Sequence, residues 1–249
     1  MSVMKLNFPP LRAVSARFRP RSSRSYGGFA RRVQKLYIQY TFAVLAILAG
    51  AVLPAAAADR PVKLVAFGDS LTAGYGLPAG QAFPVKLEQA LKAKGLAVEI
   101  ANAGVSGDTA TDGLSRIDWS VPDGVDGVIL ELGANDALRG LDPKITRDAL
   151  DKLLARFKAR GIPVLLTGMR APPNMGADYV ARFDAIFPDL AKAHDVPLYP
   201  FFLDGVAALR DLNQRDGIHP TAAGVDLIVA RIAPMVEDFV AGIRARRPG

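Results

Sequence analysis

Short apolar runs alternate along residues 62–243 with longer segments in which apolar residues recur every three or four positions. The first pattern is typical of buried strands and the second of amphipathic helices. Strands are predicted at 62–67, 97–101, 125–132, 163–167 and 196–201. Helices are predicted at 84–94, 108–118, 143–160, 177–193 and 221–243. The clearest of these is 143–160, which ends before Gly161 and carries an apolar residue every four positions: Ile145, Ala149, Leu153 and Phe157.

The order of these elements predicts the fold class. Repeated strand–helix units with nearly continuous apolar strands indicate a parallel sheet that helices cover on both faces. The composition shows neither a break nor an internal repeat after residue 58, so we expect one three-layer α/β/α domain over 59–249. Pro234 is expected to kink the last helix.

Residues 1–58 have a different pattern. Basic residues within 31–35 precede the charge-free stretch 36–58, which is strongly apolar until Pro54 and ends in four alanines. A basic region, an apolar core of about a dozen residues and small residues at its end are the three parts of a secretory signal peptide. The sequence therefore predicts export to the periplasm or the medium, with cleavage near Ala58.

A membrane anchor is the alternative interpretation of this segment. Its 23 uncharged residues approach the ~20 that span a bilayer, and the domain would then stay attached to the membrane at its N-terminus. Pro54 and the weakly apolar alanines count against the anchor. Residues 1–30 are longer than the region that usually precedes a signal peptide's apolar core, and two interpretations stay open for them: an N-terminal extension or a misassigned start of translation.

Charge and composition exclude several classes of function. The net charge of +7 comes from residues 1–58, which hold nine basic residues and no acidic one, and 22 basic and 24 acidic residues remain in 59–249. The domain therefore has no basic excess that would favour nucleic acid. The chain has no Cys and only two His, which excludes thiol nucleophiles, disulfide frameworks and multi-histidine metal centres. We expect no metal and no other cofactor.

The residues that follow the predicted strands carry the candidate chemistry. Ser70 comes after the first strand, Gly104 after the second and Asn135 after the third, while Asp216 and His219 precede the last helix. Because the carboxyl ends of parallel strands lie at one edge of a sheet, these residues are expected to meet there. They supply a nucleophile, N–H donors for an oxyanion, and a base with the carboxylate that orients it.

Each of these motifs also has a purely structural interpretation. The glycine-rich turn around Ser70 could cap a helix or hold a phosphate, although it lacks the lysine and the spacing of a P-loop. Gly104 could be a turn glycine and Asn135 a helix cap, and Asp136 is interpreted as structural. His194 is the rival base, but it lies near a predicted helix C-terminus, where a partly exposed histidine is the ordinary expectation.

Taken together, the motifs resemble the SGNH (GDSL) hydrolase superfamily. Its four blocks are matched in order by 68–71 (Gly-Asp-Ser-Leu), Gly104, 133–136 (Gly-Ala-Asn-Asp) and 216–219 (Asp-Gly-Ile-His). The flanking residues are similar to the branch of periplasmic arylesterases, thioesterase I and lysophospholipases. The resemblance implies a flavodoxin-like sandwich with a five-stranded parallel sheet in the order 2-1-3-4-5.

The resemblance also implies a role for each matched residue. Ser70 would be the nucleophile, His219 the base and Asp216 the acid that orients it. The oxyanion hole would consist of the backbone N–H groups of Ser70 and Gly104 and the side chain of Asn135. No metal takes part in this chemistry.

The activity that follows is hydrolysis of carboxylic esters or thioesters through an acyl-enzyme on Ser70. A carbohydrate esterase that deacetylates wall polysaccharide is an alternative with the same residues and a different pocket. A non-catalytic flavodoxin-like binding module is a further alternative, but it leaves Asn135 and the pair of Asp216 and His219 unexplained together. The expected partner is a small acyl substrate. We expect the domain to bind no nucleic acid and, after signal cleavage, no membrane, and we expect it to be a monomer.

The loop 167–176 leaves the same edge of the sheet after the fourth predicted strand. Ala171, Pro172 and Met175 lie in this loop, and small or adaptable apolar side chains suit an acyl tail better than a sugar. They are therefore predicted to bind substrate in an apolar groove for short to medium acyl chains. In the resembling thioesterase branch a bulkier aliphatic residue often stands where Ala171 does, so Ala171 would leave extra room. The alternative is that the loop only connects two elements.

The signal interpretation predicts that the mature protein begins near Asp59, because signal peptidase cleaves after small residues such as Ala58. N-terminal sequencing of the exported product measures this directly. Recovery of an intact 36–58 segment in washed membranes would instead support the anchor.

Overall fold

The computed structural model describes residues 60–247, so the predicted signal segment and its cleavage position lie outside the described residues. Five strands form one sheet: β1 (Val62–Gly68), β2 (Val98–Gly104), β3 (Gly127–Glu131), β4 (Val164–Thr167) and β5 (Leu198–Tyr199). Their order is β2-β1-β3-β4-β5, and every neighbouring pair is parallel. The predicted sheet and its strand order are confirmed.

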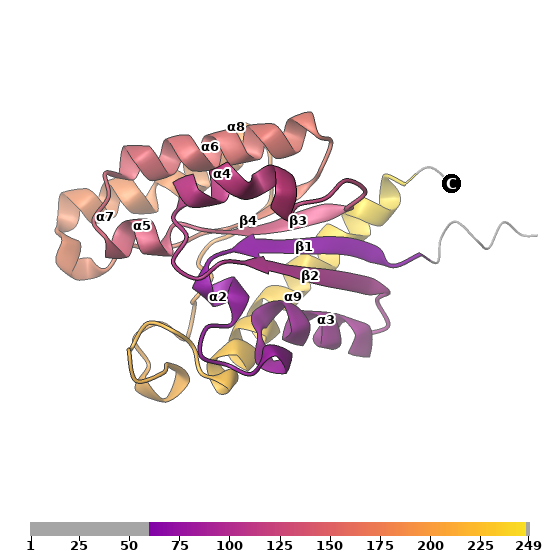
Figure 1. Ribbon diagram of the computed structural model, residues 1–249, viewed down its shortest axis with the longest axis horizontal. Coiled ribbons are helices and arrows are strands. Elements are labelled where there is room, and N and C mark those ends of the chain that lie inside the picture. Colours follow the sequence, from indigo (N-terminus) through magenta and orange to yellow (C-terminus); the bar gives the residue numbers. More distant parts are fainter. Residues whose placement is uncertain (1–59, 248–249) are drawn as a thin grey trace, which may run out of the picture. The chain divides into compact units, whose positions relative to one another are not determined.

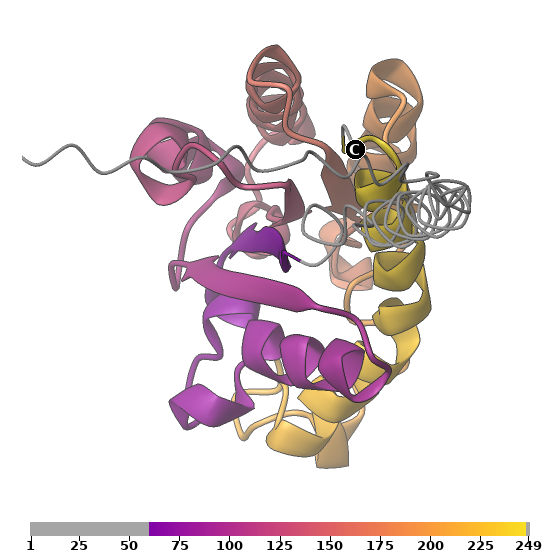
Figure 2. The same cartoon turned by 90° about the vertical axis from the view of Figure 1, so that its right-hand side faces the viewer.

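Helices cover both faces of this sheet. They are α2 (Ser70–Ala73), α3 (Phe83–Ala93), α4 (Ala110–Ser120), α5 (Ala134–Leu138), α6 (Pro143–Ala159), α7 (Ala177–Asp184), α8 (Ile186–His194) and α9 (Ala222–Ala245). Short 3₁₀ turns lie at Ala79–Gln81, Pro173–Met175 and Arg210–Leu212. Figure 1 shows α4, α6 and α8 on one side of the sheet and α3 on the other, and Figure 2 shows α9 running alongside α3.

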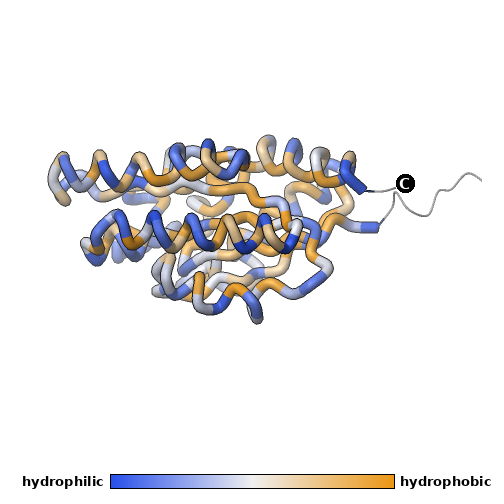
Figure 3. Tube along the Cα trace, turned by 90° about the horizontal axis from the view of Figure 1, so that it is seen from above, coloured by the Kyte–Doolittle hydropathy of each residue, from blue (hydrophilic) through white to orange (hydrophobic). Residues whose placement is uncertain are grey.

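Hydrophobic burial holds these layers together. In Figure 3 the helices carry both hydrophobic and hydrophilic residues within each turn, as expected where one side of a helix faces the sheet. Buried aromatic rings join the layers: Phe67 of β1 meets Phe157 of α6 edge to face with centroids 6.1 Å apart, and Phe83 of α3 meets Phe202 in the same way at 4.9 Å. None of the helices within residues 60–247 is both long and apolar enough to span a bilayer.

The predicted helix 143–160 is present, but its apolar stripe differs in one position. Asp142 caps the helix by accepting the backbone N–H of Lys144, and Pro143 occupies the first turn. The side chain of Ile145 is largely exposed, because a spacing of four residues drifts away from a face that repeats every 3.6 residues. The buried face is instead formed by Thr146, Ala149, Leu150, Leu153, Leu154 and Phe157.

Prolines account for two of the differences between the predicted and the observed elements. The helix 177–193 is divided into α7 and α8 at Ala185, because Pro188 has no N–H to donate to the carbonyl of Asp184. The strand 196–201 shrinks to Leu198–Tyr199, since Pro197 and Pro200 on either side cannot donate to the ladder either.

The last helix, in contrast, runs through its proline. Pro234 lies inside α9, which continues for eleven residues beyond it to Ala245. Pro234 therefore does not end the helix, and the kink expected there stays a prediction.

Strand β1 lies between β2 and β3, and this arrangement determines where a site can form. From β1 the chain passes to β2 on one side and then crosses to β3 on the other. Where the direction of winding changes in this way, the loops that follow the strands separate and leave a crevice at the carboxyl edge. Gly68, near the end of β1, pairs with both Gly104 of β2 and Glu131 of β3. The segments that follow these three residues therefore begin side by side.

Candidate active site

Ser70 is placed by the sharp turn that follows β1. Asp69 caps α2 by accepting the backbone N–H of Leu71 at 2.9 Å, and Ser70 is the first residue of this short helix. The first N–H groups of a helix have no partner within it. The backbone N–H of Ser70 accordingly has no hydrogen-bond acceptor within residues 60–247. The hydroxyl group and a free N–H donor thus belong to the same residue.

His219 and Asp216 lie beside this serine. His219 Nε2 is 2.9 Å from Ser70 Oγ, and His219 Nδ1 is 2.7 Å from Asp216 Oδ2. An ionised carboxylate only accepts hydrogen bonds, so Nδ1 carries the proton and Nε2 is free to accept the hydroxyl proton of Ser70. The arrangement can generate a serine nucleophile.

Asp216 is held ready for this role by the loop itself. Its Oδ1 accepts the backbone N–H groups of Ile218 at 3.0 Å and His219 at 3.1 Å. Partial burial tends to raise the pKa of Asp216, but the hydrogen bonds from the His219 ring and from these two backbone groups outweigh it and lower the pKa to about 2. Asp216 therefore stays ionised and can stabilise a protonated imidazole.

Tyr75 covers one face of the imidazole, a contact that the sequence motifs did not indicate. Its ring centroid lies 4.5 Å from that of His219, with the planes inclined by 36°. The backbone carbonyl of Tyr75 accepts a hydrogen bond from the Gln214 side chain at 2.7 Å, which ties it to the loop of His219. Stacking of this kind restricts the orientation of the imidazole ring.

The side chain of Asn135 also faces this site. Asn135 lies in the first turn of α5, directly after the buried β3. Its Nδ2 donates to Asp69 Oδ2 at 3.1 Å and to the backbone carbonyl of Asp108 at 3.0 Å. Both amide hydrogens thus have acceptors, so Asn135 can donate to an oxyanion only by sharing or exchanging one of these bonds.

Gly104 is placed differently from the prediction. Its N–H donates to Asn102 Oδ1 at 2.9 Å, and it does not line the cavity beside Ser70. A Cβ at this position would collide with the backbone of Ala73, so Gly104 allows β2 and α2 to approach closely. This geometry argues against Gly104 as an oxyanion donor.

Gly107, three residues further along, has the properties expected of that donor. It lines the cavity together with Ser70 and Asn135. Its N–H has no acceptor in the described part of the chain, and its φ of +91° is one that glycine adopts without strain. The carbonyl of Gly107 accepts a hydrogen bond from Arg139 at 2.7 Å. The Ser-Gly-Asp-Thr sequence at 106–109 was the signal that could have identified it.

A cavity of about 660 Å³ opens beside Ser70 and His219. No Asp or Glu is among the residues that line it within the described chain, and Arg170 stands there with its guanidinium over the ring of Phe201. Apolar residues contribute most of the remaining wall, among them Leu71, Leu138, Met169, Phe201, Leu203 and Ile218. Such a cavity suits an apolar acyl chain.

Two of the three predicted loop residues line this cavity. Ala171 and Pro172 form part of its wall, and the backbone N–H of Ala171 donates to Asp184 at 2.9 Å. Met175 does not line it, because the 3₁₀ turn Pro173–Met175 carries its terminal methyl group toward Gly140. The prediction that Met175 contacts the substrate is therefore not supported by the geometry.

Two buried carboxyl groups lie directly behind the serine turn. Glu131 Oε2 accepts the hydroxyl of Thr72 at 2.7 Å and the backbone N–H of Asp69, and neither Asp69 nor Glu131 is exposed. Burial raises the pKa of both carboxyl groups, and the repulsion from Asp69 raises that of Glu131 further. A buried pair of this kind retains a proton that an exposed pair would release.

The other candidates occupy structural positions. Asp136 is fully buried and accepts the backbone N–H of Ala110 at 3.0 Å and the hydroxyl of Thr146 at 2.9 Å, as its structural interpretation predicts. His194 Nε2 lies 2.7 Å from Asp151 on α6 and belongs to a separate contact between helices. Within residues 60–247 no cluster of three His, Cys, Asp or Glu side chains is arranged to hold a metal ion.

Known proteins are similar to this chain in sequence and in fold. Residues 66–227 match the GDSL-like lipase/acylhydrolase family. An arylesterase of Vibrio mimicus is 38% identical over 190 residues, which cover 75% of this chain and 90% of that protein. The thioesterase 1/protease 1/lysophospholipase L1 of Escherichia coli K12 is 39% identical over 195 residues, or 75% and 87% of the two chains. The crystal structure of AlinE4, an SGNH-hydrolase family esterase, superposes with a TM-score of 0.61 at 49% identity. The superposition covers 72% of this chain and 96% of the AlinE4 chain.

The buried carboxyl pair predicts how stability depends on pH. Because the pKa of Glu131 is raised in the folded protein, the unfolded chain releases a proton that the folded one keeps, and the free energy of unfolding falls as pH rises above the ordinary value of about 4.3. Glu131→Gln removes this titration while retaining an acceptor for Thr72. Urea unfolding at pH 5 and pH 8 should show a smaller loss of stability in the variant than in the wild type.

Glu99→Gln, at an exposed position of β2, is the matched control and should keep the wild-type difference between the two pH values. A Glu131→Gln variant with the same pH dependence as the wild type would show that Glu131 is ionised in the folded protein.

Proposed function

The chain belongs to the GDSL-like lipase/acylhydrolase family and is a serine ester hydrolase, and on this premise we propose that Ser70, His219 and Asp216 perform its reaction. The observation that carries the proposal is the continuous chain of contacts from Ser70 Oγ to His219 Nε2 and from Nδ1 to Asp216. The first step is attack of Ser70 Oγ on the carbonyl carbon while Nε2 takes the hydroxyl proton. His219 then returns this proton to the leaving alcohol or thiol.

Hydrolysis of the acyl-enzyme repeats these steps with water. His219 Nε2 removes a proton from the water as its oxygen attacks the acyl carbon, and then returns the proton to Ser70 Oγ when the acid leaves. Asp216 remains ionised throughout and stabilises each imidazolium, in keeping with its lowered pKa. The chemistry needs neither a metal nor another cofactor.

The tetrahedral oxyanion is proposed to bind the backbone N–H groups of Ser70 and Gly107. Both N–H groups have no acceptor within the described residues, whereas that of Gly104 is engaged with Asn102. Asn135 is the third donor and exchanges its bond to the Asp108 carbonyl for one to the oxyanion. Donors that are fixed before the reaction stabilise charge that develops in the transition state.

The proposed substrates are esters or thioesters with short to medium acyl chains. The cavity beside Ser70 is lined mainly by apolar side chains, and residues 60–247 place no carboxylate in its wall, which favours an acyl tail over an acetylated sugar. The relatives named arylesterase and thioesterase 1 support the same two bond types. We further propose that residues 1–58 direct export to the periplasm or the medium and that the mature enzyme acts as a monomer.

Substitution of the proposed residues should separate their roles. Ser70→Ala should abolish hydrolysis of a short aryl ester and labelling by an organophosphonate, and His219→Ala should be as damaging. Asn135→Ala should lower turnover by roughly 10²–10³-fold, the usual effect of losing one oxyanion donor. His194→Ala is the matched control, since this histidine contacts Asp151 instead, and should keep its activity. Full activity of a folded Asn135→Ala variant would rule out Asn135 as a donor.

Chain-length preference should depend on Ala171, which lines the cavity. Ala171→Leu and Ala171→Phe fill space in an apolar pocket, where one methylene is worth ~1–3 kcal/mol, so the ratio of kcat/KM for short and long acyl esters should change by roughly tenfold or more. Ala177→Leu adds the same side chain at an exposed position of α7 and should leave the ratio unchanged. An unaltered profile in both Ala171 variants would mean that the loop does not contact the acyl chain.

A further inference from the structure

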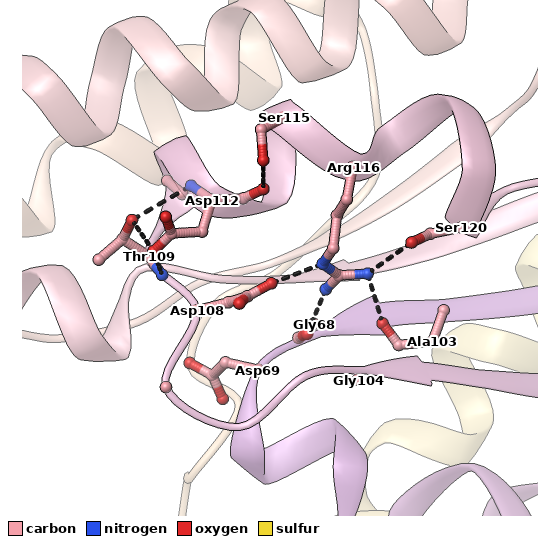
Figure 4. Close-up of polar contacts among 12 residues, drawn as sticks. Gly68, Asp69, Ala103, Gly104, Asp108, Thr109, Asp112, Ser115, Arg116 and Ser120 are labelled. Carbon is pink, nitrogen blue, oxygen red and sulfur yellow. Dashed lines mark hydrogen bonds and ion pairs between the residues drawn. The ribbon is translucent and has the colours of Figure 1, made fainter.

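One buried arginine lies between the segments that carry the proposed oxyanion donors. Arg116 is in the second half of α4, and only 4% of its surface is exposed. Its carbon Cζ lies 4.1 Å from the ring centroid of Phe67, at the end of β1. Figure 4 shows the guanidinium enclosed by polar groups, to which it donates four hydrogen bonds: to Asp108 Oδ2, Ala103 O, Ser120 Oγ and Gly68 O.

Three of these acceptors lie at the strand ends and in the turn from which the site is built. Gly68 ends β1 and is two residues from Ser70, and Nη2 binds its carbonyl at 2.8 Å. Ala103 lies near the end of β2, where Nη1 binds its carbonyl at 2.9 Å. Asp108 directly follows Gly107, and the Nε bond fixes its carboxylate. A single planar group thus joins the segment of Ser70 to the segment of Gly107.

Asn135, the third donor, is linked to the guanidinium of Arg116 through Asp108. The backbone carbonyl of Asp108 accepts the amide of Asn135 at 3.0 Å, while the side chain of Asp108 binds Arg116. A shift of Asp108 would therefore move the acceptor that orients Asn135. Each of the three donors is thus linked, through the chain or through one hydrogen bond, to a group that this guanidinium binds.

We propose that Arg116 is a positioning residue that fixes the distances between the oxyanion donors of Ser70, Gly107 and Asn135. The inference rests on the proposed function, since it assigns these groups to the oxyanion. Arg116 does not line the cavity, so it touches neither the acyl chain nor the reacting atoms. Its rigid fork has donors on three nitrogens, which reach carbonyl groups on two strands and a carboxylate at once, whereas the donors of a lysine all lie on one nitrogen.

If Arg116 only stabilised the fold, its loss should have the same effects as the loss of another buried arginine. Arg247 is a matched residue for this comparison. Arg247 is also largely buried, and it binds Asp126 Oδ2 at 2.8 Å and the backbone carbonyls of Arg60 and Pro61. These groups lie at the start of β1 and before β3, at the opposite edge of the sheet. Loss of either arginine should lower stability, but only loss of Arg116 should affect the oxyanion.

The test compares Arg116→Lys with Arg247→Lys in the full domain. Arg116→Lys keeps the charge and the apolar stem but loses the fork, and small displacements of donors cost as much as ~10²-fold in rate. The measured quantity is kcat/KM for a short aryl ester, corrected for the fraction of protein that an organophosphonate labels. We expect it to fall by roughly tenfold to a hundredfold in Arg116→Lys. Arg247→Lys should keep the corrected kcat/KM within about twofold of the wild type while its melting temperature falls.

Two inhibitors distinguish positioning from general damage. An alkyl trifluoromethyl ketone forms a hemiketal oxyanion on Ser70, so its Ki should rise in Arg116→Lys by the same factor as kcat/KM falls. The ether analogue of the ester has no carbonyl, and its Ki should stay unchanged. Equal weakening of both inhibitors, or wild-type affinity for the ketone, would overturn the positioning role.

Asp108→Asn provides a second variant in case Arg116→Lys does not fold. It keeps an oxygen acceptor for Nε but removes the charge that holds the guanidinium, and it should raise the Ki of the ketone selectively in the same way. Wild-type affinity for the ketone in folded Asp108→Asn would also overturn the proposal. Retention of activity by Ser70→Ala would instead overturn the proposed function itself, because the ketone and the ester both require Ser70.

Discussion

The hydrogen bonding of β1 on both of its sides is the constraint on which the rest of the site depends. Gly68 is in register with Gly104 on one side and with Glu131 on the other. Three chain segments consequently leave the sheet at the same level, although their residues are far apart in sequence. A parallel sheet thereby brings together the hydroxyl and N–H of Ser70, the N–H of Gly107 and the amide of Asn135, although these three residues are far apart in the chain.

This convergence has an electrostatic cost. Asp69 and Glu131 are buried behind the serine turn with raised pKa values, and Glu131 Oε1 has no hydrogen-bond partner within the described residues. Burying carboxyl groups disfavours folding unless their hydrogen bonds are satisfied. Asp69 nevertheless caps the helix of Ser70 and accepts a bond from Asn135. The same groups that weaken the fold therefore give the site its fixed geometry.

The sequence was sufficient for the parts that depend on local pattern. Apolar strands, helix periodicity and ordered motifs predicted the sheet and brought Ser70 to its carboxyl edge. The pattern of apolar residues does not distinguish Gly104 from Gly107, because both follow the predicted strand 97–101 and the path of the chain decides which N–H is free, although the Ser-Gly-Asp-Thr sequence at 106–109 was a signal for Gly107. Glu131 and Arg116 were missed for a related reason. A charged residue in a strand or helix has the same pattern whether it faces solvent or a buried partner.

The acid and the base of the candidate site come from a single loop, and this has a consequence for how the site responds to motion. Asp216 holds both the ring of His219 and the backbone N–H groups of Ile218 and His219. When this loop moves against the sheet, the pair moves as one body and its internal geometry is preserved. The position of His219 Nε2 relative to Ser70 Oγ is then the geometry that changes. Motion of the loop, whether thermal or caused by a bound substrate, therefore acts on the activation of the nucleophile and leaves the contact between Asp216 and His219 intact.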